Sequence, residues 1–420
     1  MPAALGSLPA AQQPVQSGHS SNEKSGMKIV CCSTVAFGKE AFSTLGDVEI
    51  REGRKLRPCD VSEAEMLVVR STARIGKELL EGSRIGFVGT ATIGFDHMDT
   101  SWLDASGIRW CHAPGCNAVS VAEYVVAALL VLGKRHGFRL RDKTIGVVGV
   151  GNVGSRVAER CERMGMRVLR NDPPLERRLR TECPEKASAF VALEQLLAES
   201  DIITLHVPLE KRGEFPTWRM ANGAFLGRMK RGAVLINSAR GAVVETDALI
   251  EGLRSGRILD AAIDTWEGEP SFRADLLERI SIGTPHIAGY SFDGKVNGTA
   301  MVYRAACAWA GRQPVWAPEA VLPKSPVPVI EADGRGRDDE DLLMDIVSRV
   351  YDIMADDASM RAIAADPLCA DPAERGRRFD LLRNNYRIRR EFRFTTVKAR
   401  NIALRTEDKI RGLGFEFDRG

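Results

Sequence analysis

The stretch Thr144–Gly154, TIGVVGVGNVG, decides the fold of the central part of the chain. Its first residues are typical of a buried parallel strand, and they lead into a GxGxxG pattern at Gly149, Gly151 and Gly154. The residues that follow, SRVAERCERMG, favour a helix. A strand, a glycine turn and a helix in this order let backbone N–H groups approach a pyrophosphate. We therefore predict a dinucleotide site in this loop, with Asn152 and Val153 as further contacts.

The acidic residue Asp172 lies 18 residues beyond Gly154, at the end of the next predicted strand. A carboxylate there accepts hydrogen bonds from the ribose hydroxyls and repels a 2′-phosphate. This predicts NAD rather than NADP as the cofactor, although Arg170, Arg177 and Arg178 lie close by in the sequence.

Apolar runs on both sides of this loop alternate with helical patterns, which indicates βαβ units and parallel sheets. We expect strands within 27–33, 66–71, 84–91 and 107–113, and a second series within 144–151, 167–172, 201–209, 233–239, 258–266 and 281–290. Long helices are expected over 119–137 and 341–363, and a helix running into a strand over 379–392. The predicted class is α/β: two Rossmann-like, doubly wound parallel-sheet domains for substrate and NAD, plus a small C-terminal α+β domain.

The composition divides the chain further. Residues 1–26 are rich in Ala, Gln, Ser, Gly and Pro and are predicted to be a disordered extension. Residues 27–121 and 289–312 should form a discontinuous substrate domain, and 122–288 the NAD-binding domain. Five prolines mark 313–328 as a linker, and 329–420 should form the C-terminal domain.

The charge and cysteine patterns exclude several function classes. A net charge of +3 over 420 residues gives no argument for nucleic acid or a membrane as partner. The nine cysteines form no CxxC pair and no cluster with zinc spacing, so we expect no metal and free thiols in a reducing compartment. Without a secretory signal or an apolar run of about 18 residues, the protein is predicted to be cytoplasmic.

Three polar segments follow predicted strands of the second series: INSARGAVV with Arg240, DTWEGEP with Asp264 and Glu269, and TPHIAGY with His286. Ligands of parallel sheets bind beyond the carboxyl ends of the strands. We therefore expect these residues to share one crevice with the glycine loop.

Together, the glycine loop and this Arg/Glu/His set resemble the D-isomer-specific 2-hydroxyacid dehydrogenase family over about residues 27–311. The resemblance implies that His286 takes the hydroxyl proton and that Glu269 fixes its tautomer. It implies that Arg240 binds the substrate carboxylate and that Asp264 holds the nicotinamide carboxamide. Glu267 is an alternative to Glu269, but the family's glutamate directly precedes the proline.

Finer features resemble one branch of this family, whose substrate is 4-phospho-D-erythronate. These are GTATIGFDHMD, APGCNAVSVAEYV, NDPP and PHIAGYSFDGKVNGT, together with VYDIMADDASMR and FDLLRNNYRIRREF near the C-terminus. This resemblance covers nearly all of 27–420 and implies a homodimer formed through the C-terminal domain. It places Ser71, Thr92 and Tyr290 at the substrate and Gly289 at the cofactor, and leaves Asn117 as an open candidate for the substrate.

Further positions bear on the cofactor and on the substrate phosphate. Val207 falls at a cofactor position where a polar residue is expected, and His206 is interpreted as lining the cofactor site rather than doing chemistry. The substrate phosphate needs cations. Arg70 is one candidate, and Arg383, Arg387, Arg389 and Arg390 could reach the site from the partner subunit, although a solvated helix face is the favoured interpretation of these four.

The expected reaction is therefore oxidation of 4-phospho-D-erythronate to 2-oxo-3-hydroxy-4-phosphobutanoate with NAD, in pyridoxal 5′-phosphate (vitamin B6) biosynthesis. Two alternatives stay open at this point. One is another dehydrogenase of the family, acting on 3-phosphoglycerate or on glyoxylate and hydroxypyruvate. The other is a non-catalytic, NAD-sensing corepressor-type binding protein, against which the C-terminal domain argues.

Overall fold

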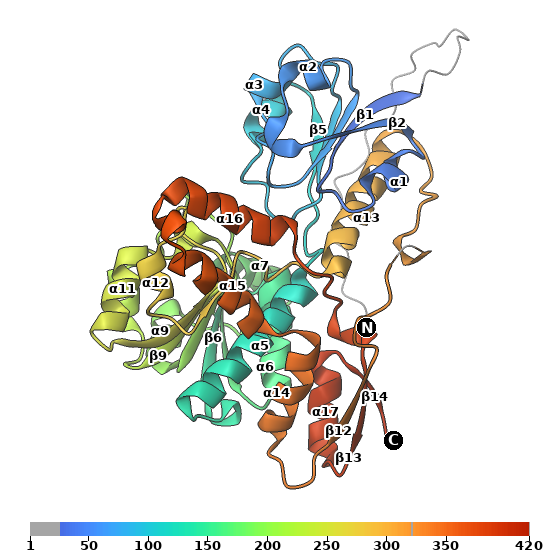
Figure 1. The fold of residues 1–420 in the computed structure, drawn as a ribbon. Helices are drawn as coiled ribbons and strands as arrows, with labels where there is room; N and C mark the ends of the chain where they lie inside the picture. The colour runs from blue at the N-terminus through green and yellow to red at the C-terminus, as the bar shows by residue number, and fades with distance from the viewer. Residues whose placement is uncertain (1–25, 321, 420) are drawn as a thin grey trace.

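The computed structural model of the protein describes residues 26–320 and 322–419, which form three parallel sheets with helices around them (Figure 1). The predicted disordered extension lies outside the described residues except for Gly26. Within the described ranges, no helix is both long and apolar enough to cross a membrane. All nine cysteines are free thiols.

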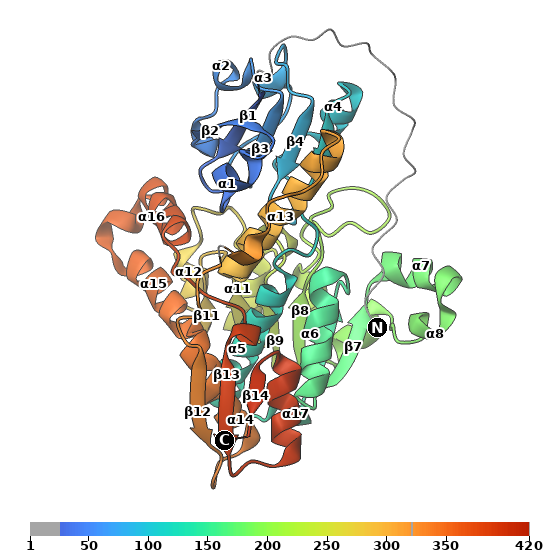
Figure 2. The same ribbon diagram turned by 90° about the vertical axis from the view of Figure 1, so that its right-hand side faces the viewer.

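The first sheet has the strand order β2-β1-β3-β4-β5. Its strands are β1 (Met27–Cys32), β2 (Gly46–Arg51), β3 (Met66–Val69), β4 (Phe87–Thr90) and β5 (Arg109–Cys111). Its short helices are α1 (Gly38–Phe42), α2 (Pro58–Val61), α3 (Lys77–Leu80) and α4 (Thr100–Ala105). The later helix α13 (Phe292–Trp309) returns to this sheet, as Figure 2 shows, and buries Val302 and Tyr303 in its core.

The second sheet has the order β11-β10-β9-β8-β6-β7. Its strands are β6 (Thr144–Val148), β7 (Arg167–Asn171), β8 (Ile202–Leu205), β9 (Ala233–Asn237), β10 (Ile258–Ile263) and β11 (Ile282–Gly283). Its helices are α6 (Asn152–Arg163), α7 (Pro173–Glu182), α8 (Pro184–Ala187), α9 (Leu193–Glu199), α10 (Gly223–Arg228), α11 (Thr246–Arg254) and α12 (Ala274–Leu277). The strand order reverses between β6 and β8, and such a switch point opens a crevice at the carboxyl ends of the strands.

The two α/β parts are joined by the helix α5 (Ala118–His136) and by the segment 289–291 before α13. Most of α5 is buried, as its apolar sequence predicts. The two larger sheets and the C-terminal sheet fall within the three predicted ranges. The boundaries of the domains themselves remain a proposal.

The C-terminal part holds a third sheet of order β12-β13-β14, with β12 (Val329–Asp333), β13 (Thr396–Arg400) and β14 (Glu416–Asp418). The helix predicted over 341–363 is wrong as a single element. It is divided into α14 (Asp339–Val350) and α15 (Ile353–Ala365), because Tyr351 has extended backbone and the Asp352 carboxylate caps α15.

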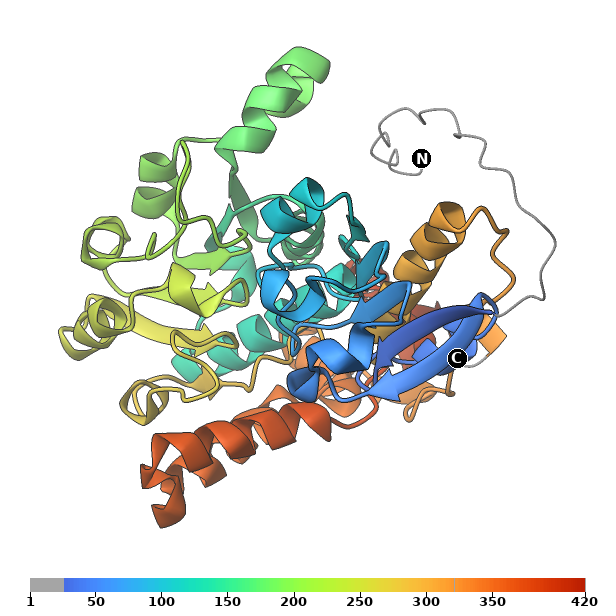
Figure 3. The same ribbon diagram turned by 90° about the horizontal axis from the view of Figure 1, so that it is seen from above.

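The helix running into a strand that is predicted over 379–392 is wrong in both parts: α16 (Pro372–Asn384) starts earlier and ends at Asn384, and the next strand, β13, begins only at Thr396. The residues after it form irregular chain before β13, and α17 (Leu404–Leu413) follows that strand. Seen from above, the orange-red pair α15 and α16 lies beside both the blue first domain and the yellow part of the second (Figure 3). Two contacts of α16 agree with this view. Pro372 O accepts a hydrogen bond from Ser271 Oγ at 2.8 Å, and Asp380 pairs with Arg54 at 2.7 Å.

Candidate active site

The glycine loop is shaped for close approach of a ligand. Gly149 has φ +84°, and a Cβ there would lie 2.8 Å from the carbonyl carbon of His206. A Cβ at Gly154 would overlap the carbonyl oxygen of Gly149, whereas a Cβ at Gly151 would meet no atom within 4 Å. The loop therefore packs closely against its own backbone and that of His206 at Gly149 and Gly154. It is open to an incoming group at Gly151, where α6 begins. This geometry fits a pyrophosphate at the start of that helix.

The remaining predicted cofactor residues surround this loop. The Asp172 carboxylate accepts hydrogen bonds from Val150 N at 2.8 Å and from Leu175 N at 3.0 Å, so it fixes the loop and caps α7. Val207 lies against Gly149, and Asn152 lies beneath the turn at Gly115. Val153 is half-buried in the first turn of α6. All of these residues follow carboxyl ends of strands, as the sequence predicts.

His286 and Glu269 form the predicted pair. His286 Nδ1 and Glu269 Oε1 are 2.5 Å apart, and both side chains are partly exposed. Burial alone would raise the pKa of the Glu269 carboxyl, but the charge and hydrogen bond of His286 outweigh it and hold that pKa below its ordinary value. Glu267, the alternative, instead accepts hydrogen bonds from Arg219 Nε and Thr246 N, both at 3.0 Å.

The backbone at His286 is held in an uncommon conformation, with φ +55°. Asp264, 1% exposed, lies beneath this turn. Its carboxylate accepts hydrogen bonds from Thr284 Oγ1 at 2.7 Å, Ile287 N at 2.8 Å and Ala288 N at 3.0 Å. Burial raises the pKa of Asp264. The structure thus places Asp264 where it supports the His286 turn, a role that its sequence position alone does not reveal.

Arg240 reaches across to the first domain. Its Nε donates to Asp96 Oδ2 at 3.0 Å, and its Nη1 donates to Ala239 O at 2.8 Å. Asp96 belongs to the loop after β4, within the GFDHMD motif, and sequence analysis did not single it out. The Asp96 side chain is 48% exposed and that of Arg240 is 29% exposed, so this ion pair is open to solvent.

The predicted substrate residues lie at the carboxyl edge of the first sheet. Ser71 is exposed just after β3, and the Thr92 hydroxyl, just after β4, donates to Gly94 O at 2.8 Å. The backbone of Gly289 lies directly against the side chain of Asn117, whose buried Oδ1 has no hydrogen-bond partner within residues 26–320 and 322–419. Asn117 therefore packs where the two domains join.

Tyr290 lies among three cations. Lys295 Nζ is 4.5 Å from the ring centroid, and the guanidinium carbons of Arg383 and Arg70 are 5.6 and 5.7 Å from it. The ring of Tyr386 packs edge-on at 6.0 Å. Lys295 was not singled out by sequence analysis, although a lysine in the first turn of a helix after the catalytic motif was a signal available there.

The solvated-face interpretation of the C-terminal arginines is wrong for three of the four. Arg389 and Arg390 are 2% and 4% exposed, and Arg383 is half-buried beside Tyr290. Arg387 alone is largely exposed, and it pairs with Asp356. For Arg389 and Arg390 the reason is that the residues after α16 pack against α5 and α13, where the buried carboxyl groups of Glu123 and Asp293 lie beside them. Arg383 belongs to α16 itself and is covered by the rings of Tyr290 and Phe379. In the described structure Arg383 reaches Tyr290 from the same subunit, so no partner is needed to bring it there.

Two other histidines near the site are poor proton carriers. Burial lowers the pKa of His206 to about 3, and burial also lowers that of His97 to about 4. Both are neutral near pH 7 and remain so well into acid. His206 hydrogen-bonds Thr204 at 2.9 Å behind the glycine loop, which agrees with its interpretation as a lining residue.

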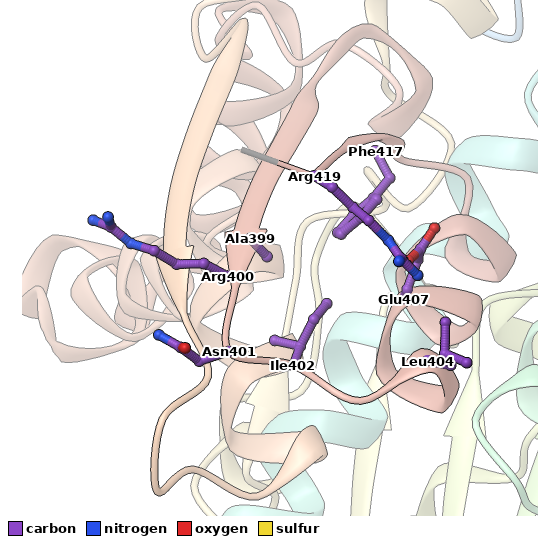
Figure 4. A pocket seen from close by; sticks show the side chains of 8 residues that line it. All are labelled: Ala399, Arg400, Asn401, Ile402, Leu404, Glu407, Phe417 and Arg419. Atoms are coloured by element: carbon purple, nitrogen blue, oxygen red, sulfur yellow. The ribbon is translucent and has the colours of Figure 1, made fainter.

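A hollow of the C-terminal domain is drawn in Figure 4, and it contains none of the predicted site residues. It is lined by Ala399, Arg400, Asn401, Ile402, Leu404, Glu407, Phe417 and Arg419. Its carboxylate, Glu407, is already paired with Arg411 and Arg419. The hollow is therefore separate from the constellation described above.

Comparison with known proteins agrees with this geometry. Residues 128–288 match the family model of the D-isomer specific 2-hydroxyacid dehydrogenase, NAD binding domain. Residues 321–414 match a model described only as a domain of unknown function. Among solved structures, a D-lactate dehydrogenase from Aquifex aeolicus, complexed with NAD and lactic acid, has a TM-score of 0.57 and 28% identity, covering 67% of this chain and 95% of its own. Fold and site thus define an NAD-dependent 2-hydroxyacid dehydrogenase.

Curated relatives narrow this class. The erythronate-4-phosphate dehydrogenase of Salinibacter ruber is 42% identical over 401 residues, which cover 93% of this chain and 99% of the relative. That of Salmonella paratyphi B is 43% identical over 366 residues, covering 87% and 92%. The chain therefore belongs to the D-isomer specific 2-hydroxyacid dehydrogenase family, in the group of the erythronate-4-phosphate dehydrogenases.

Proposed function

We propose that the protein oxidises 4-phospho-D-erythronate to 2-oxo-3-hydroxy-4-phosphobutanoate, a step of pyridoxal 5′-phosphate biosynthesis. The main observation in favour of a dehydrogenase reaction is the hydrogen bond between His286 Nδ1 and Glu269 Oε1. This pair lies at the carboxyl ends of the strands of the second sheet, as the glycine loop does. The substrate is supported by the names of the curated relatives, which match the chain over most of its length.

The proposed roles follow from the contacts of each residue. With Nδ1 bound to Glu269, His286 keeps Nε2 free to take the proton of the C2 hydroxyl. Arg240 leaves Asp96 and binds the substrate carboxylate through its planar fork. NAD, when bound, accepts the hydride that leaves C2. Asp264 holds the His286 turn in place through the Ile287 amide, and it also holds the nicotinamide carboxamide when NAD is bound.

The remaining contacts with NAD and with the substrate are proposed from where each residue lies in the fold. Gly149, Gly151, Asn152, Val153 and Gly154 bind the pyrophosphate, Asp172 the ribose, and Val207 and Gly289 the rest of the cofactor. Ser71, Thr92 and Tyr290 bind the substrate.

The assembly and location are also proposals. The third sheet ends in the edge strand β12, whose Val329 is exposed, and an unpaired strand edge is a common surface for association. A cytoplasmic homodimer through the C-terminal domain would use it. Light scattering on the full chain tests this: a mass of one chain contradicts it.

The test of function is an assay of the purified protein with NAD and either 4-phospho-D-erythronate or D-3-phosphoglycerate. We expect faster turnover of the four-carbon substrate, and faster turnover of phosphoglycerate would overturn the assignment. In a strain lacking its own enzyme, growth without vitamin B6 should be rescued by the wild type and not by His286→Ala. Rescue by neither would favour a non-catalytic binding protein, and equal rescue by both would overturn the proposed role of His286 as the base.

A further inference from the structure

The cations around Tyr290 come from three separate parts of the chain. Arg70 follows β3 in the first domain, Lys295 lies in the first turn of α13, and Arg383 lies near the end of α16 in the C-terminal domain. We call these three residues the Tyr290 cluster. Their distances to one ring, 4.5–5.7 Å, bring three positive charges to the same place.

In the described part of the chain no carboxylate lies within hydrogen-bond distance of this cluster, although Glu269 and Asp380 are near enough to raise the pKa of Arg383. Arg70 and Lys295 have no acidic side chain within 4.0 Å there, and Arg383 approaches only Asp380, at 3.8 Å. Arg383 Nε is buried and has no hydrogen-bond partner among the described residues. Burial and the charges of Arg70 and Arg383 lower the pKa of Lys295 to about 8, as expected for a cation that lacks an anion.

The cluster lies beside the proposed chemistry. Tyr290 follows His286 by four residues, and the charge of Arg383 helps to lower the pKa of the Glu269 carboxyl. The N-terminus of α13, an 18-residue helix, adds its positive end at Lys295. Two arginine forks and one lysine point charge are the groups that proteins use to bind phosphate.

We propose that Arg70, Lys295 and Arg383 bind the terminal phosphate of the substrate, so that the C-terminal domain selects the substrate within its own subunit. This rests on the proposed function and assigns a second role to a domain proposed for dimerisation. Helix α16 holds Arg383 in place because it is anchored at both ends. Pro372 contacts Ser271 of the second domain, and Asp380 pairs with Arg54 of the first.

The experiment compares 4-phospho-D-erythronate with D-erythronate, which lacks only the phosphate, in the wild type and in Lys295→Gln and Arg383→Gln. Each variant should lose roughly 10- to 100-fold in kcat/KM for the phosphorylated substrate, the range for a charge-assisted hydrogen bond, and less than about threefold for D-erythronate. The control is Arg304→Gln, an exposed arginine of the same helix α13, which should change neither value. Equal losses on both substrates, or no loss on either, would overturn the proposal.

A binding measurement separates this proposal from the proposed function. Inorganic phosphate should compete with 4-phospho-D-erythronate for the wild type, with an inhibition constant raised at least tenfold in Lys295→Gln and Arg383→Gln. Fluorescence of bound NADH, which these residues do not contact in the proposed arrangement, reports whether each variant is folded. If the wild type oxidises neither four-carbon acid, the proposed function fails. In that case the phosphate site can still be tested by measuring the thermal unfolding temperature at increasing concentrations of inorganic phosphate. An equal rise for the wild type and both variants would refute phosphate binding by the Tyr290 cluster.

Discussion

The arginines of one short segment of the C-terminal domain, residues 383–390, differ in their surroundings: two are buried in a joint between helices, and one lies in the Tyr290 cluster. Arg389 and Arg390 lie in a buried joint between α5 and α13, formed with Glu123, Asp293 and Glu391. Arg390 donates two hydrogen bonds to Asp293, at 3.0–3.1 Å, and Arg389 donates to Ser120 O at 2.6 Å. Arg383, six residues before Arg389, belongs to the Tyr290 cluster, and its nearest carboxylate in the described part of the chain is Asp380, at 3.8 Å.

This difference distinguishes arginines that stabilise the fold from cations that are available to bind a ligand. In the buried joint Arg390 pairs with Asp293, and removing one of the two leaves the other buried without its counter-charge. Arg389 is held there mainly by the backbone oxygen of Ser120, and the Glu123 carboxyl lies 3.7 Å away. In the Tyr290 cluster like charges converge, and the missing anion has to come from outside. The comparison predicts that the first group affects stability and the second affects substrate binding.

The largest effect is expected at Glu269, which adjoins the Tyr290 cluster and whose hydrogen-bond partners among the described residues are His286 and the Trp266 amide. Glu269→Gln should lower kcat by roughly 10²- to 10⁴-fold, because the histidine loses the group that orients it as a base. KM and the free energy of unfolding should change little. The control is Glu267→Gln, two residues away. An equal loss of kcat in that variant would show that His286 does not depend on Glu269.

The buried joint is tested by Arg390→Met. Asp293, which is 1% exposed, would keep the hydrogen bond from Glu391 N but lose its counter-charge, so the free energy of unfolding should fall by about 3–5 kcal/mol, measured by urea denaturation. The double variant Arg390→Met/Asp293→Leu should recover much of this loss, because it removes both charges. The exposed Arg377→Met is the matched control and should change stability by less than about 1 kcal/mol. If Arg390→Met lowers the free energy of unfolding by no more than the control does, the buried joint does not stabilise the fold as proposed.

The pH dependence of substrate binding tests the Tyr290 cluster. The pKa of Lys295 is lowered to about 8, first by burial and then by Arg70 and Arg383, which face it together with Tyr290. As pH rises through 8, Lys295 loses its charge, so kcat/KM for 4-phospho-D-erythronate should fall above that pH. D-erythronate should not show this fall, and Lys295→Arg should remove it. The same decline for both substrates would assign the titration to another group.

The smallest effect is expected at Asp96. Its ion pair with Arg240 is half-exposed and is therefore worth about 0–1 kcal/mol. Asp96→Asn frees Arg240 for the substrate carboxylate, so KM should fall by up to roughly fivefold with kcat unchanged. A raised KM would mean that Asp96 itself binds the substrate.

The sequence predicts what is local. The glycine loop, the strands around it and the order Arg240, Glu269, His286 follow from apolar runs and from polar residues at strand ends, because parallel strands gather their carboxyl ends at one edge. The long-range partners were not predictable in this way. Asp96 meets Arg240 from 144 residues away, and Arg383 meets Tyr290 across the domain boundary. The arginine-rich stretch 383–390 looks uniform in sequence, and only packing divides it into exposed, buried and ligand-facing charges.

The most direct test is a paired measurement on Arg383→Gln and Arg390→Gln, of kcat/KM for 4-phospho-D-erythronate and of the midpoint of urea unfolding. The account predicts that Arg383→Gln loses catalytic efficiency with an unchanged midpoint, and that Arg390→Gln lowers the midpoint. If both variants lower the midpoint of urea unfolding and neither lowers kcat/KM for 4-phospho-D-erythronate, Arg383 and Arg390 both act on stability alone and the account is wrong.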